Sequence, residues 1–457
     1  MTTLSRRRFL SLGAKTLTGA GLALGSNPYW TLAHAANDPG VGSDYRAIVC
    51  LFLQGGSDGF SLMVPTGNAE YNEYQRSRGS LAIDKSELLG INAASTHASA
   101  VGLHPSAAPL QHLFEEQKLA MISNVGNLIQ PTTVDQYNNR AVDLPAQLFS
   151  HADQEMQWQQ LQGRGRGTEG WGARAAGFLA QQQEREHLTS ISLDGSNHWQ
   201  TGFTSRPLSM KETGVLQYAA MSSGEPWEAA RVRAFQAAQG LPQDHEFVKE
   251  YASVQQRAMN VTEELGAVLA QNEGISITPD TGNGLAQRLA MVAQLIAARE
   301  QLGMRRQIFF VNMRGFDVHD NQSKELPGLF SELSGAMQYF QSALENLGQS
   351  ENVTTFAASD FGRSLSGNGD GTDHGWGNHL MVMGGSVKGG DIYGTLPRLA
   401  VNGPDSVSNG RVLPTTSATQ YAATLLNWMG LNESQLNQTL PTLNNFDTRD
   451  LGFMRNV

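Results

Sequence analysis

The stretch FAASDFGRSLSGNGDGTDHGWGNH, residues 356–379, decides the fold that this sequence predicts. It opens with an apolar run that is typical of a buried strand, and it continues into a glycine-rich loop. Enzymes with an α/β fold build their sites where parallel strands end. Aspartate and neutral histidine are the usual ligands of zinc and related metals. We therefore predict a metal-binding or catalytic site here, from the polar residues Asp360, Arg363, Asp373, His374 and His379.

The rest of the chain supplies further strands and the helices that would cover them. Four apolar runs read as buried strands, at residues 46–53, 119–125, 307–312 and 352–359. Helical patterns recur between and after these runs, most extensively at residues 226–273 and 284–302. The alternation predicts an α/β fold in which helices cover a sheet of parallel strands. We expect one domain over residues 36–457, with a helical insertion or cap around residues 200–300.

Two other strand ends carry acids. Asp58 lies in the motif QGGSDGF after the first strand, and Asp317 and His319 follow the third. Side chains two residues apart on an extended chain point to the same face, so Asp317 and His319 are predicted to converge on one ion. Simpler roles stay open, with Asp58 as a turn former and His319 as a structural histidine.

Ser150 is the candidate nucleophile. It precedes His151 and the segment ADQEMQWQQLQG, residues 152–163, which reads as a helix. At a helix N-terminus, free backbone N–H groups and the helix dipole favour an anion, which suits a hydroxyl that attacks phosphate or sulfate. An ordinary N-cap serine is the alternative.

Composition limits the possible functions. The chain has 457 residues, of which 40% are hydrophobic, so it can bury a large core. Its formal net charge of −10 and its lack of a basic tract argue against nucleic-acid binding. The single cysteine, Cys50, rules out an intramolecular disulfide.

The N-terminus reads as an export signal. SRRRFL precedes a weakly apolar run, and AHA stands before Ala36 as a small-residue cleavage site. The paired arginines predict a twin-arginine signal over residues 1–35, with export of the folded protein to the periplasm or the medium by the twin-arginine machinery. No other segment has the length and apolarity of a transmembrane helix.

Four motifs carry a family resemblance. GGSDGF, GFDVHDNQ, SDFGRS and GTDHGWGNHLMVMGG resemble the exported bacterial proteins of domain of unknown function family 1501. That family in turn resembles the alkaline phosphatase and sulfatase superfamily. The resemblance implies a three-layer fold with a mostly parallel central sheet between helices. It also implies an Asp/His site for one or two divalent ions, here zinc, manganese or calcium.

The resemblance also implies roles for individual residues. The superfamily's metal ligands carry over to Asp58, Asp317, His319 and Asp360, together with His374 or His379. Two features depart from the superfamily. Asp317 and His319 are closer in sequence than usual, and Phe361 follows Asp360 where a histidine is the rule.

The superfamily's nucleophile and anion-binding positions carry over less directly. Ser150 matches the nucleophile position, with Thr132 or Thr133 as the alternative. Arg363 or Arg314 would neutralise non-bridging oxygens of the substrate.

Two functions of different classes follow from these features. The first is metal-dependent hydrolysis of phosphate or sulfate esters in a small molecule or polymer. The second is a hydrolase-like scaffold without catalysis that serves as an exported binding or assembly factor. A carbohydrate hydrolase with paired carboxylates fits less well, because it leaves the histidines without a role.

Overall fold

The fold is built around β1 (Arg46–Leu53), the apolar segment RAIVCLFL. In the computed structural model, every residue of this strand after Arg46 is buried. β10 (Val353–Ser359) and β9 (Arg306–Met313) flank β1, and both run parallel to it. A central parallel strand is buried on both faces, so it needs no alternation of polar and apolar residues.

The structure describes residues 44–95, 100–165, 167–183, 185–203, 205–215, 225–239, 245–271 and 282–455. The twin-arginine signal predicted at residues 1–35 lies outside these ranges. Within them, no helix combines the length and the apolarity that crossing a membrane requires.

The described strands form a ten-stranded central sheet in the order β14-β5-β13-β10-β1-β9-β6-β7-β8, with β17 paired to β5. Among these strands, β13 and β8 are antiparallel to their neighbours, and the other pairings are parallel. The predicted, mostly parallel sheet is therefore confirmed. The bounds of the strands beyond β1, β9 and β10 are β5 (Leu119–Gly126), β6 (Ser190–Ser192), β7 (Leu208–Lys211), β8 (Gly214–Val215), β13 (Asn378–Met383), β14 (Ile392–Tyr393) and β17 (Thr416–Ser417).

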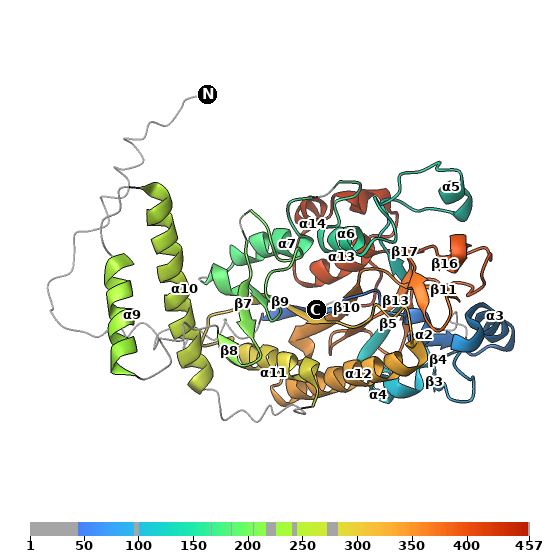
Figure 1. The fold of residues 1–457 in the computed structure, drawn as a ribbon, viewed down its shortest axis with the longest axis horizontal. Helices are drawn as coiled ribbons and strands as arrows, with labels where there is room; N and C mark the ends of the chain where they lie inside the picture. Colours follow the sequence, from blue (N-terminus) through green and yellow to red (C-terminus); the bar gives the residue numbers. More distant parts are fainter. Residues whose placement is uncertain are drawn as a thin grey trace. The chain divides into compact units, whose positions relative to one another are not determined.

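Helices cover both faces of the sheet, which confirms the three-layer architecture (Figure 1). One layer consists of α4 (Ala108–Glu115), α11 (Gly284–Ala297) and α12 (Gln322–Asn346). The other consists of α6 (His151–Gln160), α7 (Trp171–Ala180), α13 (Ala418–Trp428) and α14 (Glu433–Thr439). Two further helices, α9 (Pro226–Gln239) and α10 (Glu246–Gln271), occupy the region in which the sequence predicts an insertion or cap.

The stretch at residues 356–379 folds as two strands of the sheet with a hairpin between them. β10 ends at Ser359, the antiparallel pair β11 (Arg363–Gly367) and β12 (Thr372–His374) follows, and β13 returns to the sheet. Other elements are α2 (Gly59–Leu62), α5 (Val134–Asn138), β15 (Ser406–Val407), β16 (Arg411–Val412), and short 3-10 helices at Gly79–Leu81, Pro105–Ala107, Glu186–Leu188, Ser350–Asn352, Ser408–Gly410 and Pro441–Asn445.

The sequence patterns did not predict the short strands and helices. Residues 70–100 read as loop and short polar helix, but they contribute to α3 (Asn68–Arg78) and to a small sheet of β2 (Met63–Pro65), β4 (Val101–Leu103) and β3 (Leu89–Ile91). The C-terminal tail reads as closing loops, but it contains α14. Strands of three residues are too short to show a hydrophobic period, so only tertiary pairing defines them.

Candidate metal centre

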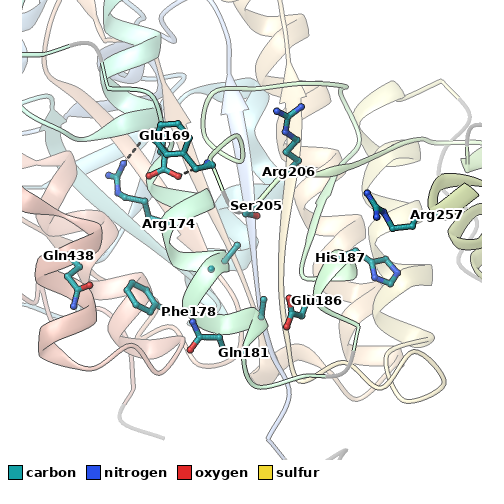
Figure 2. Close-up of a pocket in the computed structure, with 14 residues that line it drawn as sticks. Glu169, Arg174, Phe178, Gln181, Glu186, His187, Ser205, Arg206, Arg257 and Gln438 are labelled. Atoms are coloured by element: carbon teal, nitrogen blue, oxygen red, sulfur yellow. Dashed lines mark hydrogen bonds between the residues drawn. The ribbon is translucent and has the colours of Figure 1, made fainter. Parts of the chain in front are cut away.

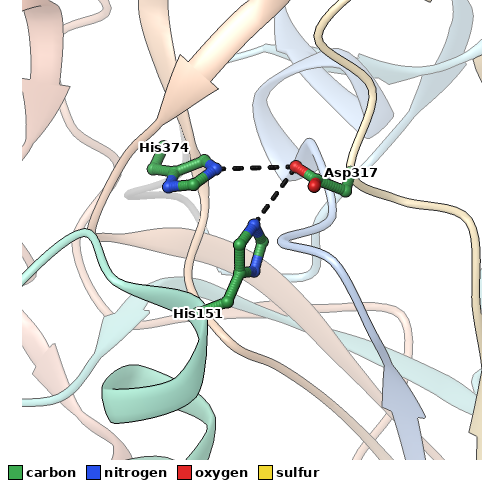
Figure 3. A group of neighbouring side chains, drawn as sticks. All are labelled: His151, Asp317 and His374. Carbon is green, nitrogen blue, oxygen red and sulfur yellow. Dashed lines mark ion pairs between the residues drawn. The ribbon is translucent and has the colours of Figure 1, made fainter.

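Three side chains from distant segments converge beyond the carboxyl ends of the central strands (Figure 3). His151 is the first residue of α6, Asp317 follows β9, and His374 is the last residue of β12. One nitrogen or oxygen of each lies within 4.8 Å of the others. Asp317 Oδ1 is 3.2 Å from His151 Nε2 and 3.5 Å from His374 Nε2. Two imidazoles and one carboxylate at this spacing form a ligand set that zinc enzymes use.

The imidazole of His374 is fixed in one tautomer. Its Nδ1 lies 2.7 Å from the carbonyl oxygen of Phe149. A carbonyl only accepts, so the proton is on Nδ1 and the neutral ring presents the lone pair of Nε2 to Asp317. Burial lowers the pKa of His374, which favours this neutral form.

Phe149 adopts an unusual backbone conformation to make this contact. Its φ is +74°, in the left-handed region that non-glycine residues seldom adopt. The guanidinium of Arg411 lies 4.1 Å from the centre of the Phe149 ring, and Arg411 Nε donates to the carbonyl of His374. Strained residues of this kind cost about 1–3 kcal/mol and gather at functional sites.

His151 is oriented from behind by Asp360. The Oδ2 atom of Asp360, a buried residue at the end of β10, lies 2.7 Å from His151 Nδ1. The Nε2 atom of His151 is buried and makes no hydrogen bond to a described residue, although it lies 3.2 Å from Asp317 Oδ1. The hydrogen bond with Asp360 raises the pKa of His151. A carboxylate behind an imidazole that faces an ion is the usual support of a metal-ligating histidine.

His319 is a fourth candidate ligand. Its Nε2 lies 2.9 Å from His374 Nε2 and 3.0 Å from Asp317 Oδ1. Its Nδ1 is 3.7 Å from a carboxylate oxygen of Asp373. Arg363 Nη1, which can only donate, lies 3.5 Å from the same Nε2 atom of His319.

Arg363 holds the loops that carry the cluster. Its guanidinium is buried and donates to the carbonyls of Gly55, Gly56, Phe316 and Thr372 at 2.7–3.1 Å, and to Asp317 Oδ1 at 2.6 Å. Every nitrogen of this side chain donates to a protein acceptor. We therefore assign Arg363 to positioning Asp317, in place of the substrate contact that the sequence suggested. Although burial raises the pKa of Asp317, the hydrogen bond and charge of Arg363 hold it below its usual value.

Two glycines let these loops approach one another. Gly55 has a φ of +113°, and a Cβ there would lie 2.4 Å from the backbone nitrogen of Asp317. A Cβ on Gly371 would lie 2.0 Å from the carbonyl oxygen of His319. Any larger side chain would push the backbone of a candidate ligand away. The glycine-rich motifs of the sequence thus serve close loop packing.

The structure does not bring Asp58 or His379 into the cluster. Asp58 is buried, with Oδ1 2.6 Å from Arg78 Nη2, and its Oδ2 accepts from Ser61 and Gln322. The Nδ1 atom of His379 accepts from the backbone N–H of Asn124 at 3.3 Å. Burial lowers the pKa of His379 to about 3, so the ring is neutral inside the core. We leave both residues out of the ligand set that we propose.

The predicted nucleophiles make local contacts. Ser150 is the N-cap residue of α6, and its hydroxyl donates to Asp153 at 2.9 Å. Thr133 caps α5 in a reciprocal arrangement with Gln136, and the Thr132 hydroxyl donates to the carbonyl of Gln130. Of the three, Ser150 directly precedes a candidate ligand, His151, so it remains our proposal for the nucleophile.

Two residues of the site were not predicted from the sequence. His151 follows Ser150, but a lone histidine at a helix start shows no ligand spacing. Glu155 is one helical turn further along α6, where burial and the charge of Asp360 raise its pKa. Its carboxylate accepts from Gln54 at 3.4 Å and from Gln159 at 3.2 Å. The sequence does contain one signal for these two residues: a histidine is followed four residues later by an acid, and residues at this spacing lie on one face of a helix.

A separate cavity of about 1020 Å³ lies beside α7 (Figure 2). Its polar and aromatic lining includes Arg174, Phe178, His187, Arg206 and Arg257. None of the candidate ligands lines it. The proposed metal chemistry therefore does not belong to this cavity.

Comparison with solved structures found matches at low identity. Ps i-CgsB in complex with k-i-k-neocarrahexaose is 12% identical, with a TM-score of 0.37 and coverage of 88% of this chain and 77% of that chain. The PsFucS1 sulfatase from Pseudoalteromonas sp. is 12% identical, with a TM-score of 0.34 and coverage of 94% and 78%. The phosphonate monoester hydrolase SpPMH from Silicibacter pomeroyi is 10% identical, with a TM-score of 0.33 and coverage of 85% and 74%.

No curated protein matches this sequence significantly. A family model described as "Protein of unknown function (DUF1501)" matches residues 45–441. The matched range contains all the candidate ligands and most of the chain. The resemblance seen in the four sequence motifs is thereby confirmed, and the chain belongs to the DUF1501 family.

Proposed function

We propose that this protein is an exported, metal-dependent hydrolase of phosphate or sulfate esters. One observation carries the proposal: two imidazoles are held through their Nδ1 atoms, so that their Nε2 atoms face one carboxylate oxygen. His151 is held by Asp360, His374 by the carbonyl of Phe149, and the shared oxygen belongs to Asp317. Export rests on the signal predicted at residues 1–35, and ester chemistry rests on the superfamily resemblance of the motifs.

The donor set favours zinc or a similar transition metal. His151, Asp317 and His374 offer two nitrogens and one oxygen, and His319 offers a third nitrogen. Calcium prefers a shell made only of oxygens, whereas imidazole suits zinc and its neighbours. Of the zinc, manganese and calcium named by the resemblance, calcium thus fits least well. A bound ion would supply a Lewis acid for an ester oxygen.

The protein's own groups would then carry the protons. Ser150 Oγ would form the new bond to phosphorus or sulfur, and its proton would pass to Asp153, to which it already donates. The ester bond would break, and the leaving oxygen would take a proton from Glu155. Water would then attack phosphorus or sulfur, give one proton to Glu155 and break the bond to Ser150 Oγ, which takes back the proton held by Asp153. Burial and the charge of Asp360 raise the pKa of Glu155, which favours its protonated, proton-donating form.

An activity assay tests this proposal. The purified protein would be given aryl phosphate and aryl sulfate esters, with zinc, manganese, calcium or a chelator. We expect hydrolysis with zinc or manganese, its loss with the chelator, and at least about a hundredfold lower kcat in Ser150→Ala. Asp320→Asn is the matched control, because Asp320 is exposed on the same loop as Asp317 and is no member of the ligand set. Activity unchanged in Ser150→Ala would contradict the nucleophile assignment.

The binding or assembly factor is the second candidate, and one observation favours it. Asp58 is engaged with Arg78, and the described residues show a single group of potential metal ligands. A site for two clamping ions is therefore not evident in this part of the chain. Stoichiometric zinc binding without hydrolysis of any ester would support this second function over the first.

A further inference from the structure

The long helix α10 carries a heptad pattern of apolar residues. Small and large apolar side chains recur at alternating spacings of four and three residues, at Phe247, Tyr251, Val254, Ala258, Val261 and Leu265. This spacing places them along one seam of the helix, and such a seam packs against another helix in coiled coils.

The seam is covered in its C-terminal half. Leu265 is fully buried in the main core, and Val261 packs against that core. Glu264 forms an ion pair with Arg185 at 2.7 Å, which fastens this half of α10. The C-terminal half of the seam thus packs on the domain, and Met259, which lies outside the seam, is buried as well.

The N-terminal half of the seam is exposed. The exposed fractions are 82% for Phe247, 65% for Tyr251 and 46% for Val254. α9 contacts α10, yet it leaves these three side chains open to solvent. Exposed apolar side chains that are contiguous on one face mark interaction surfaces, unlike apolar residues scattered singly.

The exposed half-seam is complementary to itself in shape. If two copies of α10 pair antiparallel about a point between Tyr251 and Val254, Phe247 lies against the partner's Ala258. Tyr251 then lies against the partner's Val254. Each layer combines a large side chain with a smaller one, as interdigitated packing requires.

The charged residues beside the seam also favour the antiparallel arrangement. Glu250 and Arg257 occupy the same heptad position, one heptad apart, and both side chains are exposed. Within one chain they form an ion pair of 3.0 Å. In the antiparallel pair, Glu250 faces the partner's Arg257 on both sides of the axis. A parallel pair would place Glu250 beside the partner's Gln255 and gain no opposite charge.

We propose that the exposed half-seam of α10, from Phe247 to Ala258, is the interface of an antiparallel homodimer. The partner is a second copy of this chain, because both the shape and the charges of the surface complement themselves. The proposal does not depend on the metal centre or on catalysis.

Sedimentation velocity over a range of concentrations tests the dimer. We expect a reversible monomer–dimer equilibrium in the purified protein. Tyr251→Glu should raise the dissociation constant of the dimer by more than about tenfold, because it places a charge in the apolar interface. Lys249→Glu, on an exposed side chain outside the seam, is the matched control and should change it little. A protein that stays monomeric at every concentration, or equal effects of the two variants, would overturn the proposal and leave this face to another occupant.

A mixing experiment tests the antiparallel orientation. Glu250→Arg and Arg257→Glu should each weaken self-association, because each creates two like-charge contacts across the axis. An equimolar mixture of the two variants should form a heterodimer, since every contact between the partners then joins opposite charges. The ion pair within each chain stays broken in this mixture, so it cannot explain the recovery. Failure of the mixture to associate better than either variant alone would refute the antiparallel pairing.

Discussion

Asp360→Asn probes the support of the proposed metal site. In the structure, Asp360 Oδ1 accepts from the backbone N–H of Gly55 at 3.3 Å, and Oδ2 lies 2.7 Å from His151 Nδ1. An asparagine that keeps the Gly55 contact turns its NH₂ group toward Nδ1. That nitrogen must then accept, so the proton of His151 moves to Nε2, the atom that we propose as the ligand.

The expected effect is a loss of zinc affinity. Removing such a support typically costs 10- to 100-fold in metal affinity, which is about 1.4–2.7 kcal/mol. We would measure the affinity by zinc titration against a competing chromophoric chelator, at pH 8 to limit competition from protons for the His151 ring, whose pKa the hydrogen bond with Asp360 raises. Asp320→Asn, on the same loop as Asp317, is the control and should bind like the unchanged protein. If Asp360→Asn folds normally and keeps full zinc affinity, the proposed role of Asp360 is incorrect.

Three further predictions follow from the packing around the site and in the core. Arg363→Met should lower the free energy of unfolding, measured in urea, by about 3–5 kcal/mol, because it leaves Asp317 and several carbonyls without their donor. Arg314→Met, at an exposed side chain, is the control and should lower it by less than about 1 kcal/mol. Gly371→Ala should weaken zinc binding by displacing the backbone of His319, whereas Gly90→Ala, where a Cβ meets open space, should not. The pKa of His379 falls from 6.5 to about 3 on folding. The unfolded chain therefore binds the extra proton below pH 6.5, and stability falls as pH falls, by roughly 2 kcal/mol at pH 5 for this residue. Nitrogen NMR that shows a protonated His379 ring at pH 5 would contradict this.

The sequence predicts the long elements of the fold well and the short ones poorly. β1, β5, β9 and β10 agree with the predicted runs to within one residue. Their apolar composition follows from burial on both faces, and that signal is local. β2, β3 and β4 have three residues each, and only their pairing partners define them. The helix α12 begins at Gln322 and accommodates Pro327 in its interior, which sequence patterns do not predict for a proline.

The candidate site shows what strand ends can and cannot reveal. Asp317 and His319 were singled out after the third predicted strand and His374 in the glycine-rich loop, and the three side chains lie close together in the structure. Strand ends do not reveal which side chain faces which partner: Asp360, a predicted ligand, lies 2.7 Å from His151 Nδ1 in the structure. Asp58 shows the same limit, because its partner Arg78 comes from a helix whose packing no local pattern encodes.

The histidine that completes the proposed site comes from α6, a helix with no ligand motif. His151 reaches Asp317 only because α6 starts beside the loop that carries His374. A lone histidine acquires a ligand's orientation from its hydrogen-bond partner, and that partner is more than two hundred residues away in the sequence. Such a relation is visible in three dimensions alone.

The most direct test of the proposed metal site is the position of the ion itself. Crystals of the zinc-loaded protein, measured on both sides of the zinc absorption edge, would give an anomalous difference map. The proposed site predicts one strong peak within about 2.0–2.2 Å of His151 Nε2, an Asp317 oxygen and His374 Nε2. A peak elsewhere, or none in protein that binds zinc in solution, would contradict it.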